Sequence, residues 1–339
     1  MKAIFKSRAC LGGLELIEYE EPTLTNGMTL VRILKTAICG TDIHIYNWDN
    51  WAQKTIRPPQ IIGHEFVGEV IKTKSERIKI GDIVSGEGHI VCGICRHCIT
   101  GESHLCRKTI GIGVDAHGVF SEIIAFPTRN LWVCPKDISL DLLAIMDPLG
   151  NAYHTATAFN VLGEDVLITG AGPIGLMCVS ILLRAGARYI VVTDINKKRL
   201  DMAKNLGATR AVLPRELPEV IKELNMKEGF DVGLEVSGSS EGFRSTIKYM
   251  ANGGGVALLG IPPGDATADW NKVVFSSLTI KGIYGRRIFD TWYKITALLQ
   301  SGLEIASIVT HSYDYTEYEA AFLAMKSGET GKVILSWSV

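Results

Sequence analysis

Residues 166–175, VLITGAGPIG, constrain the fold more than any other stretch of the sequence. Apolar and β-branched residues lead directly into Gly170, Gly172 and Gly175, and an apolar run continues beyond them. This order suits a strand, a tight turn and a helix, the setting in which GxGxxG binds a dinucleotide. The first glycine permits the turn, the second lets the backbone approach the pyrophosphate, and the third lets helix and strand pack. A lone GxGxxG also occurs in ordinary glycine-rich turns. The surrounding sequence must therefore show whether this motif binds a dinucleotide.

The sequence around this motif alternates short apolar runs with helical patterns. Helices such as PIGLMCVSILLRAGA and KKRLDMAKNLGA separate the predicted strands, which are VLITG, YIVVTD, AVL, FDVGLEVSG and GGGVALLG. Alternating strands and helices predict an α/β fold with a doubly wound parallel sheet of Rossmann type. Residues 166–183 carry no charge over 18 positions, which is long enough to suggest a membrane span. The glycines and the proline inside the run favour the strand, turn and helix instead.

Asp194 strengthens the dinucleotide prediction. It ends the second predicted strand, 19 residues after Gly175, close to the spacing of about 20 residues at which an acid binds the ribose hydroxyls. Its carboxylate would repel a 2′-phosphate, which favours NAD over NADP. Arg199 and Lys198 lie nearby in the sequence and could still hold such a phosphate. Two interpretations suit Arg199 equally well. It either contacts the adenosine of the cofactor or lies on the solvent-exposed face of its helix.

The remainder of the chain has a different pattern. The first 150 residues contain short extended runs with turn residues between them, such as LVRILKTAI, FVGEVIKT, GDIVSG and GVFSEIIAF, and predict a small β-rich domain. After residue 280 we expect helices at about 292–301 and 317–325 and a strand at 332–337. A length of 339 residues suggests two domains. The predicted division is 1–149 with 290–339, and 150–289.

The composition excludes several function classes. There are 35 Lys and Arg against 36 Asp and Glu, a net charge of −1. Without a run of like charges, nothing indicates nucleic acid or an anionic membrane as a partner. The sequence MKAIFKSRACLGG has no continuous apolar block followed by a cleavage site, so we predict no signal peptide and expect a cytoplasmic protein.

Four of the eight cysteines, Cys92, Cys95, Cys98 and Cys106, are crowded into one loop. They are too close together for a set of long-range disulfides, and such spacing without a predicted secretion signal indicates a metal. Four thiolates close a tetrahedral zinc site and leave no position for water, which is typical of a structural site. The alternative is four unrelated free thiols. The lobe would span about 88–108.

A second group of candidate ligands precedes this lobe. Cys39 lies in ICGTDIH, and His64 and Glu65 lie in GHEFVGEV. Cysteine and histidine are good zinc ligands, and three protein ligands leave the open position that a catalytic zinc needs. The spacing alone also allows a buried core cysteine and a hydrogen-bonded loop histidine.

Together, CGTD, GHEFVGEV, the four-cysteine lobe and GAGPIG resemble the zinc-containing medium-chain alcohol dehydrogenases. Longer segments, among them AICGTDIHIYNWDNWAQKTI, VSGEGHIVCGICRHC and MDPLGNAYHTA, are similar to threonine-oxidising members of that family. The resemblance covers essentially the whole chain. It implies a GroES-like catalytic domain, a Rossmann domain, and zinc-dependent oxidation of the 3-hydroxyl of L-threonine by NAD to 2-amino-3-oxobutyrate. A polyol or simple secondary alcohol is the alternative substrate.

The resemblance also implies a role for each candidate residue. Cys39, His64 and Glu65 would hold the catalytic zinc, and the four cysteines of the lobe the structural zinc. Thr41 and His44 correspond to the proton relay. Asp147, in MDPLGN, is either a fourth ligand or a relay partner.

Further residues are implied at the cofactor and at the substrate. The resemblance places six residues along the cofactor cleft: Ile174, Leu259, Gly260, Ile261, Ile283 and Tyr284. For Ile174 and Leu259, a place in the hydrophobic core is the alternative. Trp48 and Trp51 either cap the substrate pocket or form an exposed aromatic pair at a subunit contact. The resemblance further implies a homotetramer.

Overall fold

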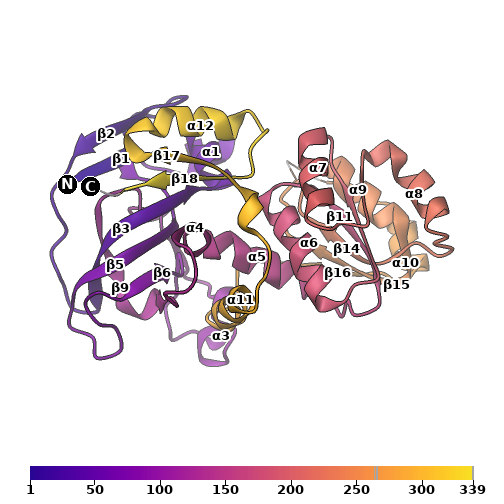
Figure 1. Cartoon of the computed structure of the whole chain (residues 1–339), viewed down its shortest axis with the longest axis horizontal. Coiled ribbons are helices and arrows are strands. Elements are labelled where there is room, and N and C mark those ends of the chain that lie inside the picture. The colour runs from indigo at the N-terminus through magenta and orange to yellow at the C-terminus, as the bar shows by residue number, and fades with distance from the viewer. Residues whose placement is uncertain (263, 265, 338–339) are drawn as a thin grey trace. The chain divides into compact units, whose positions relative to one another are not determined.

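The computed structural model describes residues 1–262, 264 and 266–337, and the chain forms two compact units (Figure 1). Unit 1 comprises Met1–Asp147, Arg287–Gln300 and Val309–Val339, and unit 2 comprises Pro148–Arg286 and Ser301–Ile308. The prediction places the return to the first domain at residue 290. The structure has it at 287 and also gives residues 301–308 to unit 2, which the sequence pattern does not indicate.

The main sheet of unit 1 has seven strands in the order β10-β6-β5-β3-β18-β17, with β9 also paired to β3. β3 (Met28–Ile38) is its centre, because β5 pairs along nearly its whole length, β9 along its first half and β18 along its second half (Figure 1). The other strands are β5 (Glu65–Thr73), β6 (Ile83–Gly86), β9 (Ile123–Pro127), β10 (Leu131–Val133), β17 (Val309–Asp314) and β18 (Lys332–Ser336).

Two smaller sheets complete unit 1. They contain β1 (Lys2–Lys6), β2 (Leu14–Glu18) and β4 (Gln60–Ile61) in one, and β7 (His89–Ile90) and β8 (Ile110–Gly111) in the other. The helices are α1 (Gly40–Asn47), α2 (Asn50–Thr55), α3 (Arg96–Ile99), α4 (Leu140–Ala144), α11 (Asp290–Gln300) and α12 (Tyr318–Lys326). α5 (Met146–Ala156) begins in unit 1 and continues into unit 2. Phe66, Phe126 and Trp337 are among the large side chains of the core.

Unit 2 has a six-stranded parallel sheet in the order β13-β12-β11-β14-β15-β16. In chain order this is 3-2-1-4-5-6, the order of a doubly wound dinucleotide-binding sheet. The strands are β11 (Asp165–Thr169), β12 (Tyr189–Thr193), β13 (Arg210–Val212), β14 (Phe230–Glu235), β15 (Met250–Leu258) and β16 (Thr279–Gly282). The predicted Rossmann sheet and the predicted β-rich domain are both confirmed.

Helices connect the strands of unit 2: α6 (Pro173–Ala185), α7 (Lys197–Asn205), α8 (Leu217–Glu223), α9 (Ser240–Tyr249) and α10 (Trp270–Phe275). α6 has the expected boundaries, because Pro173 at its first turn presets the backbone and Gly186 ends it with a left-handed φ of 81°. All five residues of β11 are buried, as a central parallel strand requires. Among the described residues, no helix is long and apolar enough to cross a membrane.

Candidate active site and nucleotide site

Strand pairing brings Cys39, His64 and Glu65 together. In the antiparallel pairing of β3 with β5, Ala37 lies opposite Glu65. Cys39 directly follows the end of β3, and His64 directly precedes β5, so the same pairing places both beside one another. One ligand atom from each of the three residues lies within 4.8 Å of the others.

The N-terminus of α1 fixes the position of Cys39. Cys39 is the N-cap of this helix, and its amide donates a hydrogen bond of 2.9 Å to Oδ2 of the buried Asp42. Thr41 follows in the first turn, with Oγ1 at 4.0 Å from Sγ of Cys39. His44 lies one turn further on the same helix face, since residues three apart are neighbours on a helix. The predicted relay residues therefore lead away from Cys39 along one helix.

Lys332, from β18, contacts the same cluster. Its Nζ lies 2.5 Å from Oε2 of Glu65 and donates to the carbonyl oxygen of Ile38 at 2.9 Å, and both ionic side chains are buried. Burial lowers the pKa of Lys332, but the negative groups around it, Glu65 foremost, together outweigh burial and raise the pKa. Oε1 of Glu65 has no hydrogen-bond partner among the described residues, so one buried carboxylate oxygen is left to bind something else.

The electrostatic surroundings of His64 favour positive charge. Burial lowers its pKa, but the negative groups around it, Cys39 foremost, outweigh burial and raise the pKa to about 10. A thiolate, an imidazole and a buried carboxylate oxygen in a negative environment are a donor set that suits zinc, with a coordination position left for another ligand. The residues therefore fit the implied metal.

Asp147 belongs to the same neighbourhood. It is 5% exposed at the start of α5 and interacts electrostatically with both His64 and Glu65. A Cβ on Gly88 would lie 3.6 Å from Cβ of His64 and 3.8 Å from Oδ2 of Asp147. Asp147 is not part of the three-residue group whose ligand atoms converge. Its nearness to His64 and Glu65 does not choose between the two predicted roles.

The four predicted lobe cysteines also converge. Sγ of Cys98 lies 3.5 Å from that of Cys95 and 4.0 Å from that of Cys92, and Cys106 lies 3.5 Å from Cys92. Tetrahedral zinc–sulfur bonds of about 2.3 Å would place the sulfurs about 3.8 Å apart. Hydrogen bonding by the amide of Cys98 lowers the pKa of Cys95 to about 6, which favours the thiolate. These distances and thiols fit a closed zinc site.

The glycines of the fingerprint occupy the positions that the motif requires. Gly170 has a φ of 105°, and a Cβ there would approach the backbone of Ser237 to 2.8 Å. A Cβ on Gly175 would lie 2.0 Å from the carbonyl oxygen of Gly170. Gly172, the N-cap of α6, has open space where its Cβ would be. Two glycines thus permit close packing, and the middle one leaves a helix N-terminus open to an anion.

Asp194 is hydrogen-bonded to this loop. Its Oδ2 accepts the amide of Ala171 at 2.6 Å, and its Oδ1 accepts the amide of Asn196 at 2.8 Å. The carboxylate therefore supports the glycine-rich turn, a contact that sequence spacing does not reveal. Arg199 lies on α7, and its buried Nε has no hydrogen-bond partner among the described residues. An unpaired donor thus lies five positions after Asp194 in the sequence.

The other predicted cofactor residues lie at one edge of the same sheet. Leu259, Gly260 and Ile261 follow β15, and Ile283 and Tyr284 follow β16, just as the glycine loop follows β11. Ligands bind at this carboxyl edge in open α/β sheets. Ile261 is 89% and Tyr284 54% exposed, whereas Ile283 is 7% exposed and packs inward. Ile174 lies half-buried in the first turn of α6, and Leu259 is also half-buried.

Gly260 is required for a steric reason. A Cβ there would lie 2.3 Å from the amide nitrogen of Gly238 and 2.4 Å from Oε2 of the buried Glu235. Its amide donates to the carbonyl oxygen of Glu235 at 3.0 Å. The loop after β15 is thereby held against the loop after β14.

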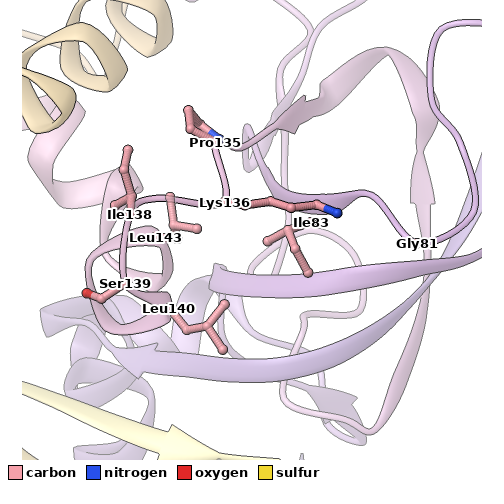
Figure 2. Close-up of a pocket in the computed structure, with 8 residues that line it drawn as sticks. All are labelled: Gly81, Ile83, Pro135, Lys136, Ile138, Ser139, Leu140 and Leu143. Carbon is pink, nitrogen blue, oxygen red and sulfur yellow. The ribbon is translucent and has the colours of Figure 1, made fainter.

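An open hollow of about 460 Å³ elsewhere in unit 1 contains none of these residues (Figure 2). Ile83, Ile138 and Leu143 line it, and Lys136 supplies its only charge. Its lining residues include no cysteine, histidine or carboxylate to bind a metal, so its volume does not indicate the site of catalysis.

Sequence reasoning missed Lys332 and Asp42. Asp42 had a signal, because it follows the helix N-cap by three residues in CGTD, the spacing of a capping box. Lys332 had none: it lies 293 positions after Cys39 and reaches the cluster only because β18 pairs with β3, where Val333 is opposite Ile38.

Family models and solved structures agree with this arrangement. Residues 25–136 match the alcohol dehydrogenase GroES-like domain, and residues 173–301 match the zinc-binding dehydrogenase family. An alcohol dehydrogenase from Thermus sp. ATN1 superposes with a TM-score of 0.90 at 27% identity, covering 99% of each chain. The 2R,3R-butanediol dehydrogenase of Bacillus subtilis has a TM-score of 0.87 at 25% identity, also over 99% of each chain.

Curated relatives are much closer in sequence. An L-threonine 3-dehydrogenase of Chromobacterium violaceum is 55% identical over 341 aligned positions, covering 99% of this chain and 100% of that protein. One of Burkholderia thailandensis is 56% identical over 330 positions, covering 96% of each. The chain therefore belongs to the zinc-binding alcohol dehydrogenase family.

Proposed function

We propose that this chain oxidises the 3-hydroxyl of L-threonine with NAD, giving 2-amino-3-oxobutyrate, NADH and a proton. The observation that carries the chemistry is the convergence of Cys39, His64 and Glu65 within 4.8 Å, with Thr41 beside Cys39. The substrate is supported by two curated relatives named L-threonine 3-dehydrogenase, at 55% and 56% identity.

Cys39, His64 and Glu65 would hold the catalytic zinc. When bound, zinc acts as a Lewis acid that lowers the pKa of an alcohol oxygen, as it does for bound water. The buried pair of Glu65 with Lys332 keeps one carboxylate oxygen occupied and leaves Oε1 as the available donor. Asp147 would act as a fourth ligand or as a relay partner beside His64.

Thr41 and His44 would move the proton. The Thr41 hydroxyl can accept and donate a hydrogen bond at once, and it lies 4.0 Å from the Cys39 sulfur. It would accept the substrate proton and pass one to His44, one helical turn away. The imidazole of His44 is 61% exposed, so it can release the proton to water. Histidine is suited to such transfer near neutral pH.

Unit 2 would bind the cofactor at the carboxyl edge of its sheet. NAD, when bound, supplies the hydride acceptor. Gly170, Gly172 and Gly175 would give the pyrophosphate access to the N-terminus of α6, and Asp194 would bind the ribose. The residues that follow β15 and β16 would line the cleft. The carboxylate of Asp194 makes NAD the preferred dinucleotide.

The remaining assignments rest on the family. The four lobe cysteines would hold a structural zinc. We infer a homotetramer from the family resemblance, and a cytoplasmic location because no signal peptide is predicted. Size-exclusion chromatography with light scattering would test the tetramer, and any other mass for the holoenzyme would contradict it.

The first experiment is initial-rate NADH formation from NAD with L-threonine, L-serine, sorbitol and 2-butanol, before and after chelation. We expect activity to be highest with L-threonine, to be lost on chelation and to return with zinc. If only sorbitol or 2-butanol turns over, the substrate assignment is wrong and the dehydrogenase chemistry stands. Activity that resists complete zinc removal would contradict the metal role.

His44→Ala tests the relay in the same assay. Losing a positioned general base typically costs about a hundredfold or more in rate, and the affinity for NAD should change little. Exposed His311 offers a matched control, because His311→Ala removes an imidazole from β17, where it contacts Thr310. Equal rates for the two variants would remove His44 from the mechanism.

A further inference from the structure

Asp49 contacts a proposed relay residue directly, although the sequence analysis assigns it no role. Its Oδ2 lies 2.5 Å from Nδ1 of His44. Its Oδ1 accepts the amides of Trp51 and Ala52, both at 3.0 Å, and so caps helix α2. One carboxylate therefore holds the start of a helix and the ring of His44 at the same time.

The local chain path explains this contact. Trp48 ends α1 in a left-handed conformation, with a φ of 54°. The chain reverses there, which brings Asp49 back to a side chain five residues earlier. Trp51, in the helix that Asp49 caps, meets the His44 ring edge-on at a centroid distance of 6.1 Å. The ring is thus held at Nδ1 and along one edge.

Asp49 is suited to accept a hydrogen bond from histidine. Burial raises its pKa, but the amide of Ala52, the side chain of His44 and the amide of Trp51 outweigh burial, so the pKa lies below its ordinary value. An ionised carboxylate only accepts hydrogen bonds, so Nδ1 of His44 must carry the hydrogen. In the neutral ring, Nε2 then has the free lone pair.

We propose that Asp49 is a positioning residue for proton removal: it holds His44 in the Nδ1–H tautomer, so that Nε2 is the atom that accepts the proton, and it stabilises the resulting imidazolium. This inference rests on the function proposed above. As the alcohol O–H bond breaks, Thr41 takes that proton and gives its own to Nε2. The proton then leaves Nε2 for water, and Asp49 stays ionised throughout, as in serine hydrolases.

Two substitutions separate the contact from the helix cap. Serine is as good an N-cap as aspartate but is too short to reach His44, so Asp49→Ser removes only the histidine contact. Asp49→Asn keeps the cap and an acceptor oxygen but removes the charge. Asp314→Asn is the matched control, because Asp314 caps a short helix in the same unit by accepting the amide of Thr316 at 3.0 Å.

The tautomer is measured in the zinc-loaded full-length protein by 15N NMR with labelled histidine, and His44→Ala assigns the signal. We expect Nδ1–H in the wild type and in Asp49→Asn, and a shift towards Nε2–H in Asp49→Ser. Turnover should fall about ten- to a hundredfold in Asp49→Ser. The KM for NAD should stay within about twofold of the wild type, because only proton removal is affected.

The proposal is overturned if Asp49→Ser keeps the Nδ1–H tautomer, or if its turnover falls no further than that of Asp314→Asn. If Asp49→Ser does not fold, Asp49→Asn tests the proposal instead. Unchanged turnover of Asp49→Asn would exclude stabilisation of the imidazolium by the Asp49 charge. If the wild type oxidises no alcohol, the proposed function fails. The spectra of the wild type and Asp49→Ser still decide whether Asp49 sets the tautomer.

Discussion

The two clusters of candidate metal ligands are built in different ways. The four cysteines of the lobe come from the 15 residues 92–106, where short turns and α3 bring the sulfurs together. Cys39, His64 and Glu65 come instead from the facing ends of β3 and β5, and Lys332 arrives on β18. The first cluster is a local structure, and the second is a product of sheet register.

This difference predicts how substitutions in each cluster affect activity and stability. A one-residue slip of β5 against β3 would turn Glu65 to the opposite face of the sheet, so the assembled cluster depends on the core beneath it. The lobe needs only its own loop and its metal. Substitutions at the assembled cluster should therefore act on chemistry or on the core, and those in the lobe on local stability.

Cys39→Ser should have the largest effect on activity. Loss of a metal ligand removes several kcal/mol of transition-state stabilisation, or about a thousandfold or more in turnover. The melting temperature and the affinity for NAD should change little, because Cys39 follows a strand and is not part of the core. Exposed Cys10 supplies the control in Cys10→Ser. An unfolded Cys39→Ser protein would mean that the cluster is structural.

Lys332→Met should have the largest effect on stability. It leaves the carboxylate of Glu65 buried without its cation, which typically costs about 3–5 kcal/mol. Denaturant unfolding of the zinc-free protein would measure this, and adding Glu65→Gln should restore part of the loss. Strictly additive effects of the two substitutions would contradict the coupling inferred from the 2.5 Å contact.

Cys98→Ser should have a smaller and more local effect. The lobe would lose its zinc and open without the main sheet, at a cost of roughly 1–2 kcal/mol in global stability. Metal analysis should find one zinc per subunit in place of two, and limited proteolysis should cut within residues 88–108. Loss of activity as complete as in Cys39→Ser would argue against two independent clusters.

Arg32→Ala should have the smallest effect. Arg32 lies opposite Glu69 across β3 and β5, at 3.4 Å, with the two side chains 56% and 38% exposed. Such a pair is worth at most about 1 kcal/mol, and buried side chains set the register. Thermal unfolding and the threonine assay should both stay close to the wild type. A large loss of activity would show that the exposed pair does help to align Cys39 with His64.

Many helices and strands of both units were predictable because their patterns are local. The predicted helix at 292–301 is α11 (Asp290–Gln300), and the predicted strand at 332–337 is β18 (Lys332–Ser336). β15 starts three residues before the predicted GGGVALLG, at Met250. Pairing with β14 extends that strand, and a glycine-rich sequence gives no signal of such pairing.

For the candidate sites, sequence alone determined which residues could bind a metal or a dinucleotide. The cysteine spacing and GAGPIG both act through neighbours in the chain, so both were visible without a structure. Only the tertiary structure decided that Cys39 meets His64, that Lys332 balances Glu65 and that Asp49 turns back to His44. The first two contacts depend on which strands pair and in which register, and the third on a left-handed turn at Trp48. Hydrophobic burial and backbone geometry select these features over the whole fold, so no short motif records them.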